Sequence, residues 1–362
     1  MDIDKKELTE EELETYSRQI VYRHIGYTGQ LKLRNAKVCI VGLGGLGSPI
    51  ATQLTAMGVG YLRLIDRDVV ERSNLHRQHL YDVSSVGYPK VEVAAKKLRM
   101  LNPDVNFEPF PVSLNAENAL KLIDGVDVVL DGLDSIETRY LINRICVKLK
   151  IPYVFGAAIM DYGNLSTIIP GETPCLECFY PNMKDKMFPK CSVAGVHPSV
   201  LGMVSSLQIS EAIKILLGKK PYLTGKLLYV DLTNMSLNEI DIAQINNCPV
   251  CGVDPVMSPL LIQQKFIEEM CGRGGKKTFI ITPKENLELN LDNLYKSFCE
   301  QGVRIEVKAD LGLSVSYRKG ITLNILTSGI MIAKGLHNAD DVLKIYSKEI
   351  VNNLKIPWSR IR

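Results

Sequence analysis

The stretch that decides the fold reads Lys37-Val-Cys-Ile-Val41, then Gly42-Leu-Gly-Gly-Leu-Gly47, and ends after an apolar helical pattern in Tyr61-Leu-Arg-Leu-Ile-Asp66. The run 38–41 is apolar and rich in β-branched residues, which is typical of a strand buried on both faces of a parallel sheet. Its glycines have the G-x-G-x-x-G spacing that lets a phosphate approach the backbone where a helix begins. An acid that ends the second strand is placed to bind a ribose hydroxyl. The stretch therefore predicts a nucleotide site.

Length and composition limit the class of protein. The 362 residues have room for one large α/β domain and a smaller domain, and contents of 46% apolar and 23% charged residues are typical of a soluble globular protein. A net charge of +3 argues against nucleic acid or a membrane surface as a partner. We find no apolar stretch long enough to span a membrane and no secretory leader, and the nine cysteines show no small-domain disulfide pattern. We therefore expect a cytoplasmic protein.

The order of elements predicts a Rossmann-like, doubly wound and mostly parallel sheet, followed by a small α+β domain. We expect the large domain at 1–254, a linker at 255–275 and the small domain at 276–362. Strands are predicted at 38–41, 61–65, 126–130, 152–157, 163–169, 226–231 and 236–241, and helices at 5–25, 29–35, 90–101, 135–149 and 198–217. The small domain reads as a strand at 277–282, a helix at 290–301, short strands within 303–334 and a helix at 338–351.

A polar and basic loop follows the second strand. It carries Arg72, Asn74, Arg77 and Gln78, and Lys90 opens the next helix. Open α/β sheets bind ligands at the carboxyl ends of their strands. Three additional cations there suit a triphosphate and its departing pyrophosphate better than a redox dinucleotide. A solvated charged loop is the alternative interpretation.

Acidic residues follow the strand that ends at Leu130. A carboxylate in this place suits Mg²⁺, which prefers one or two carboxylates plus phosphate oxygens. We favour Asp134, although Asp131 could do the same work or pair with Arg139. Ser135 is placed to cap the following helix.

Two Cys-x-x-Cys pairs are present, Cys175-Leu-Glu-Cys178 and Cys248-Pro-Val-Cys251. Four thiolates in two such pairs make a closed tetrahedral Zn²⁺ site. A redox pair would follow a strand and open a helix, and neither pair has that setting. We expect structural zinc that ties the end of the large domain to its middle.

Cys191 belongs to neither pair. The adjacent Lys190 and a helix that begins soon afterwards would both lower the pKa of its thiol, which is what a nucleophilic cysteine needs. An incidental thiol is the alternative.

From about residue 16 to 252 the chain resembles the MoeB/ThiF family of ubiquitin-activating-like adenylyltransferases. The resemblance is carried by Tyr16-Ser-Arg-Gln-Ile20, the glycine turn, Asp66-Arg-Asp68, Ser73-Asn-Leu-His-Arg-Gln78, Gly87-Tyr-Pro-Lys90, both cysteine pairs, Cys191-Ser-Val-Ala-Gly-Val196 and Ser206-Leu-Gln208.

The resemblance implies ATP- and Mg²⁺-dependent adenylation of the C-terminal glycine of a ubiquitin-like sulfur carrier that ends in Gly-Gly, with release of pyrophosphate. It implies a homodimer, because Arg18 matches an arginine that reaches the partner's site, and a thioester or sulfur-transfer role for Cys191. Arg18, Arg77, Lys90, Asp134 and Cys191 would then serve catalysis. The implied nucleotide contacts are Gly42, Gly44, Gly45, Gly47, Asp66, Asp68, Asn74, Arg77, Gln78, Lys90, Asp134 and Ser135.

Two features depart from the family pattern. The usual Cys-Thr-Asp-Asn is Gly132-Leu-Asp-Ser135, which keeps the acid and loses the amide. The tail lacks the cysteine loop of a rhodanese domain and looks like the small extension of some bacterial and archaeal members. It is either a docking surface for the carrier or an inert domain.

Two other classes remain open at this point. One is a nicotinamide-dependent oxidoreductase, and the other is a non-catalytic zinc-stabilised binding module. The residues do not distinguish among molybdopterin, thiamine, tRNA thiolation and protein tagging as the pathway served.

Overall fold

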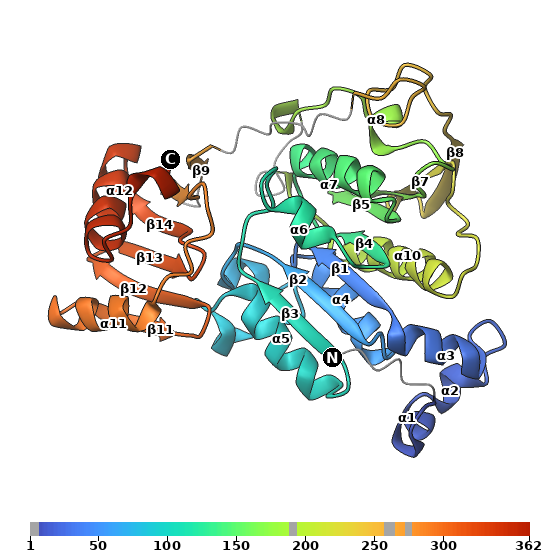
Figure 1. Ribbon diagram of the computed structural model, residues 1–362, viewed down its shortest axis with the longest axis horizontal. Helices are drawn as coiled ribbons and strands as arrows, with labels where there is room; N and C mark the ends of the chain where they lie inside the picture. The colour runs from blue at the N-terminus through green and yellow to red at the C-terminus, as the bar shows by residue number, and fades with distance from the viewer. Residues whose placement is uncertain (1–6, 188–193, 257–264, 272–276) are drawn as a thin grey trace.

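The computed structural model describes residues 7–187, 194–256, 265–271 and 277–362. Its first sheet has eight strands in the order β3-β2-β1-β4-β5-β6-β7-β8 (Figure 1). Their bounds are β1 Lys37–Val41, β2 Tyr61–Ile65, β3 Asn106–Phe110, β4 Val128–Asp131, β5 Tyr153–Ile159, β6 Tyr162–Ile168, β7 Lys226–Asp231 and β8 Ser236–Asp241.

The sheet is parallel from β3 to β5 and antiparallel from β5 to β8. The expectation of a mostly parallel, Rossmann-like sheet is confirmed for the half that carries the glycine turn. There the carboxyl ends of β1, β2 and β4 meet at one edge, so the segments that follow these strands are brought together.

Helices cover both faces of this sheet, as a doubly wound fold requires. Val38 and Ile40 of β1 pack in one core cluster with α4, α5 and α10, whereas Cys39 and Val41 pack in the other with α6 and α7. The helices are α4 Gly47–Ala56, α5 Lys90–Leu101, α6 Ala119–Ile123, α7 Ile136–Leu149, α8 Leu176–Phe179 and α10 Pro198–Leu216.

Helix α10 is long and apolar enough to cross a membrane by length and composition alone, but half of it is buried within the fold. It packs against α4, β4, β5 and β6. It is therefore the core helix of this domain.

The N-terminal helix predicted over 5–25 is divided. The structure has α1 Glu10–Thr15 and α2 Ser17–Ile20, followed by α3 Gly26–Asn35. The division falls at Tyr16, which is buried and whose hydroxyl accepts a hydrogen bond from the Asn102 side chain at 2.7 Å. Burying this aromatic ring against the domain explains why the helix does not run straight.

The second domain has a six-stranded antiparallel sheet in the order β11-β12-β13-β14-β10-β9. Part of the predicted linker, β9 Ile267–Cys271, is an edge strand of this sheet, so the linker prediction is wrong for these residues. The other elements are β10 Lys277–Ile281, α11 Leu291–Glu300, β11 Arg304–Lys308, β12 Gly312–Arg318, β13 Ile321–Leu326, β14 Met331–Leu336 and α12 Ala339–Tyr346. Helices α11 and α12 pack on one face of the sheet through a core of its own.

The two domains share a small apolar cluster. Val69, which follows β2, packs with Ile280, Leu326, Ile330 and Ile332 of the second domain. The second domain therefore lies against the carboxyl edge of the first sheet, as Figure 1 shows.

Candidate functional site

The glycine turn between β1 and α4 is shaped by close backbone approaches. Gly42 has φ +89°, and a Cβ on it would lie 2.5 Å from the carbonyl oxygen of Gly132, in the loop after β4. A Cβ on Gly47 would lie 1.7 Å from the carbonyl oxygen of Gly42. Gly44 has open space beside it, the nearest atom to its added Cβ being the side-chain nitrogen of Gln78 at 3.7 Å. The turn thus exposes backbone next to the N-terminus of α4, where an anion would be stabilised.

Asp66 holds this turn in place from the end of β2. One carboxylate oxygen accepts a hydrogen bond from the Leu43 amide at 2.7 Å, and the other accepts from the Asp68 amide at 2.7 Å. Burial raises the pKa of this carboxyl, and the charge of Lys90 opposes that rise. Asp66 follows β2 at the carboxyl edge of the sheet, and its contact with a ribose stays a prediction.

Lys90 and two acids form a buried charged group beside the turn. The ammonium of Lys90 lies 2.9 Å from a carboxylate oxygen of Asp68 and 4.0 Å from one of Asp66. Burial lowers the pKa of Lys90, but the charges of Asp66 and Asp68 outweigh it and hold that pKa above its ordinary value. Lys90 is therefore held beside the glycine turn at the carboxyl edge of the sheet, which is where open α/β folds form their binding crevice.

The loop after β2 wraps the turn from the other side. Two hydrogen bonds hold this loop in shape. The side chain of Asn74 accepts from the Glu71 amide at 3.1 Å, and the guanidinium of Arg77 donates to the Ser73 carbonyl at 2.8 Å. Gln78 is buried, and its side-chain carbonyl oxygen has no hydrogen-bond partner among the residues that the structure describes. The Gln78 side chain, whose nitrogen lies nearest to Gly44, therefore has an acceptor left for a further partner.

Asp131 and Asp134, the two candidate metal ligands, differ in their environments. Asp131 is fully buried and accepts from Arg139 at 2.9 Å, from the Tyr153 hydroxyl at 2.6 Å and from the Leu133 amide at 2.9 Å. Asp134 is exposed and has no hydrogen bond or ion pair within the described part of the chain, yet its charge raises the pKa of Lys90. Asp131 is structural, and Asp134 is available to a metal ion.

Ser135 has a role that competes with nucleotide contact. Its hydroxyl accepts from the Thr138 amide at 3.2 Å, which caps α7, and donates to Asp185 at 2.8 Å. The predicted cap is confirmed, whereas the predicted nucleotide contact would require this hydroxyl to serve an additional partner.

Arg18 and Cys191 are not brought to this crevice. Arg18 lies on α2, which packs beside α3, and α3 leads into the amino end of β1, at the opposite edge of the sheet. Cys191 lies outside the described residues. Gly45 faces α10, because its added Cβ would meet Leu201 at 2.6 Å.

Sequence reasoning missed Arg67, which lies between the two acids of the crevice. Its guanidinium donates to Ser113 at 3.2 Å and makes a two-fold ion pair with Glu268 of β9, at 2.8 and 2.9 Å. The pair joins residues 201 positions apart. No local spacing could have indicated it.

The two cysteine pairs meet in space. All four sulfur atoms lie within 4.8 Å of one another, with 3.6 Å from Cys175 to Cys248 and 3.4 Å from Cys178 to Cys251. Sulfurs at the corners of a tetrahedron around zinc would be about 3.8 Å apart, given Zn–S bonds of about 2.3 Å. A hydrogen bond from Cys175 lowers the pKa of Cys251 to about 5. The four thiols therefore fit a closed zinc site.

Helix α7 positions the first cysteine pair. Asn143 accepts from the Leu176 amide at 3.0 Å, and Arg144 pairs with both carboxylate oxygens of Glu177 at 2.8 Å. Such outer contacts fix the orientation of metal ligands.

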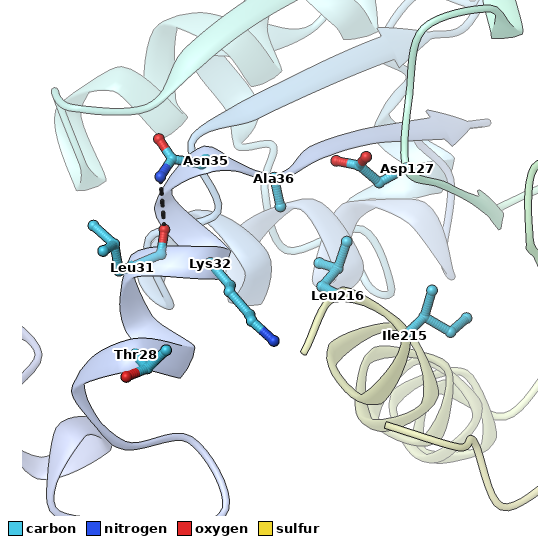
Figure 2. Close-up of a pocket in the computed structure, with 8 residues that line it drawn as sticks. All are labelled: Thr28, Leu31, Lys32, Asn35, Ala36, Asp127, Ile215 and Leu216. Atoms are coloured by element: carbon cyan, nitrogen blue, oxygen red, sulfur yellow. Dashed lines mark hydrogen bonds between the residues drawn. The ribbon is translucent and has the colours of Figure 1, made fainter. Parts of the chain in front are cut away.

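A groove of about 520 Å³ lies at the amino edge of the first sheet, between α3 and the end of α10 (Figure 2). Lys32 donates to the Leu217 carbonyl at 2.9 Å, Asn35 donates to the Leu31 carbonyl at 3.0 Å, and Asp127 accepts from the Lys37 amide at 2.7 Å. These polar groups serve helix and strand ends, and the groove lies at the edge of the sheet opposite to the glycine turn.

Comparisons with known proteins show the family of this chain. The sequence model of the ThiF family matches residues 16–250. The sulfur carrier protein adenylyltransferase of Thermus thermophilus is 40% identical over 264 residues, which cover 71% of this chain and 97% of that protein. The SAMP-activating enzyme E1 of Haloferax volcanii is 40% identical over 242 residues, which cover 67% of this chain and 89% of that protein.

Two further comparisons extend this picture. The adenylyltransferase and sulfurtransferase MOCS3 of Drosophila persimilis is 37% identical over 291 residues, but the chain spans only 64% of that protein. The crystal structure of E. coli MccB with ATP has a TM-score of 0.57 and 26% identity, over 66% of this chain and 74% of that one.

Proposed function

This chain belongs to the ThiF family, and on that premise we propose that it adenylates the C-terminal glycine of a small ubiquitin-like sulfur carrier at the expense of ATP. The observation that supports the proposal is the convergence of Asp66, Lys90 and Asp134 on the open glycine turn. The curated relatives named above are adenylyltransferases and an activating enzyme, and the oxidoreductase alternative finds no support.

The reaction needs one bond to form and one to break. A carboxylate oxygen of the carrier's terminal glycine attacks the α-phosphorus of ATP, and the bond from that phosphorus to the bridging oxygen breaks, which releases pyrophosphate. The product is the carrier with AMP joined to its terminal carboxylate, an acyl-adenylate. Asp66 would bind the ribose, and the glycine turn and the start of α4 would receive the phosphates.

Cations would stabilise the charge that develops on pyrophosphate. Lys90 is held at the crevice, and Arg77 and Asn74 lie on the loop beside it. Preorganised charges of this kind are usually the largest contribution to such catalysis. Asp134, free of other partners within the described chain, would hold Mg²⁺, which neutralises phosphate charge when bound.

We also propose a homodimer, on the position of Arg18. Because α2 lies at the amino edge of the sheet, Arg18 is remote from the crevice of its own subunit. Val21 and Tyr22 beside it are exposed, as residues of a contact between subunits would be in an isolated chain. Arg18 would then act in the crevice of a partner.

A second step through Cys191 rests on the sequence alone. Its thiolate would attack the acyl-adenylate carbonyl, a thioester would form, and AMP would leave. Intact-mass measurement after mixing the protein, ATP and a carrier, with Cys191→Ser as control, detects this adduct.

The proposed function is tested by ATP–pyrophosphate exchange in the presence of a sulfur carrier that ends in Gly-Gly. We expect exchange that requires the carrier and disappears with a carrier lacking its last glycine. Arg77→Ala should lower kcat/KM on the order of 100-fold, because one transition-state cation is lost. NADH binding without exchange, or full exchange by both Arg77→Ala and Asp134→Ala, would contradict the proposal.

A further inference from the structure

The second domain contacts the segments that build the nucleotide crevice. The hydroxyl of Ser314 donates to the Gly87 carbonyl at 2.6 Å, and that of Ser328 donates to the Pro111 carbonyl at 2.7 Å. Lys334 pairs with Glu71 at 2.6 Å. These contacts fall on the loops after β2 and β3 and on the turn before Lys90. The domain is therefore built into the support of the site.

One contact reaches a charged residue between the two crevice acids. Arg67 separates Asp66 from Asp68 in the chain, and both of its terminal nitrogens are engaged by the carboxylate of Glu268. Paired N–H···O bonds of this type fix the guanidinium plane as well as its charge. Both side chains are 28% exposed, so water screens the pair only in part.

Arg67 has other carboxylates within electrostatic reach. Burial lowers the pKa of its guanidinium, whereas Glu268 raises it, and so do the charges of Asp68 and Asp134. An arginine that loses its carboxylate partner stays positively charged, because its guanidinium does not give up a proton in proteins. Without the Glu268 charge, Asp68 and Asp134, the latter being the proposed metal ligand, would be the remaining carboxylates that act on this guanidinium.

We propose that Glu268 is a positioning residue of the nucleotide site, and that it keeps Arg67 from turning toward Asp134, so that this carboxylate stays available to Mg²⁺. This rests on the proposed function only for the identity of the ligand, Mg²⁺ with ATP. It gives the second domain a role in the chemistry, and that role is distinct from carrier docking.

The chain offers a matched control on the same strand. Glu269, the neighbour of Glu268, pairs with Lys277 at 2.8 Å on the opposite face of the sheet, and both side chains are a little under half exposed. Glu268→Gln and Glu269→Gln remove the same charge from β9, but only the first releases Arg67.

The test is calorimetric binding of ATP to the full chain over a series of Mg²⁺ concentrations. Glu268→Gln should raise the Mg²⁺ concentration that gives half of the full ATP affinity about tenfold, the usual size of the effect of removing an outer partner of a metal site. Glu269→Gln should match the wild type. ATP affinity without Mg²⁺ should be unchanged in both variants.

The double variant Arg67→Gln/Glu268→Gln separates positioning from plain destabilisation. If Arg67 is the competitor, removing it should return the Mg²⁺ requirement most of the way to the wild-type value. A double variant no better than Glu268→Gln alone, or a Glu268→Gln variant equal to the wild type, overturns the inference. A wild type that binds Mg²⁺ and ATP but shows no carrier-dependent exchange refutes only the proposed reaction.

Discussion

At the scale of single residues, the role of each charged side chain in the crevice depends on which partners it has within the fold. Asp131 and Asp134 lie three positions apart, yet Asp131 is buried and accepts hydrogen bonds from Arg139 and Tyr153, whereas Asp134 is exposed. The carboxylate of Asp66 accepts hydrogen bonds from two backbone amides, which fixes the turn without a ligand. Among the acids of the crevice, Asp134 has no hydrogen-bond partner within the described residues.

Replacing Lys90 with Met tests the buried charged group. The variant keeps the length of the side chain but leaves Asp66 and Asp68 without their cation. Removing one partner of a buried pair costs about 3 to 5 kcal/mol. Because water reaches Asp68, we expect a loss of about 2 kcal/mol in the free energy of unfolding at pH 7, measured by urea denaturation.

The loss in this variant should depend on pH. In the wild type, the charge of Lys90 opposes the burial that raises the pKa of Asp66 and, with Arg67, holds the pKa of Asp68 below its usual value. Without Lys90 both values rise in the folded state, so stability is lost as pH rises through them. The deficit should therefore be smaller at pH 5 than at pH 7. Lys97 lies on the same helix as Lys90 and pairs with Asp82, which is exposed, so Lys97→Met should change stability little. A deficit independent of pH would refute this account.

The sequence predicts those site residues whose position is fixed by the segment in which they lie, and it does not predict contacts between distant segments. Asp66 and Asp134 each follow a buried strand of a parallel sheet, so spacing alone places them at one edge. The contact between Arg67 and Glu268 depends on how two domains dock, and nothing in either segment encodes that. The engagement of Ser135 by Asp185 is likewise a contact between distant segments.

At the scale of elements, the turn between β1 and α4 is the part that tolerates least change. Strong apolar periodicity predicts β1, β2, α5, α7 and α10 nearly to the residue. Strand β3 escapes such reasoning because Pro109 argues against a strand. The structure admits the proline because β3 is an edge strand, where a ladder partner is missing on one side.

Gly47→Ala tests the turn. The new methyl would lie 1.7 Å from the carbonyl oxygen of Gly42, a backbone atom that cannot rotate away. We expect a loss of about 3 kcal/mol in the free energy of unfolding, at the upper end of overpacking effects, and loss of ATP binding in calorimetry.

Gly202→Ala is the matched control in a helix. Apart from the backbone of its own helix, no atom of the described residues lies within 4 Å of a Cβ added to Gly202 of α10. Alanine there should raise stability by roughly 0.5 to 1 kcal/mol and leave ATP affinity unchanged. Equal effects of the two substitutions would mean that backbone approach does not shape the turn.

At the scale of the whole molecule, the four cysteines close the first domain at its far end. The pair 175–178 follows β6 and is held by α7, whereas the pair 248–251 follows β8. Most residues of β8 are exposed, and its outer edge has no neighbouring strand within the described sheet. The thiol cluster is thus what anchors the chain after this edge, before it continues to the second domain.

Removing one thiol should therefore loosen that end without disabling the crevice at the other. We expect the wild type to bind one zinc ion per chain by elemental analysis, and Cys248→Ser to lose it. Loss of a structural metal ranks among the largest single-site effects, so Tm should fall on the order of 10 °C. Below that temperature ATP affinity should stay close to the wild-type value, because no contact of the cluster reaches Asp66 or Lys90 in the described structure.

Cys299 on α11, whose thiol is exposed, provides the control, and Cys299→Ser should change neither zinc content nor Tm. Zinc loss with an unchanged Tm would remove the cluster from any part in stability, and loss of ATP binding in the folded variant would show that the two ends of the domain are coupled.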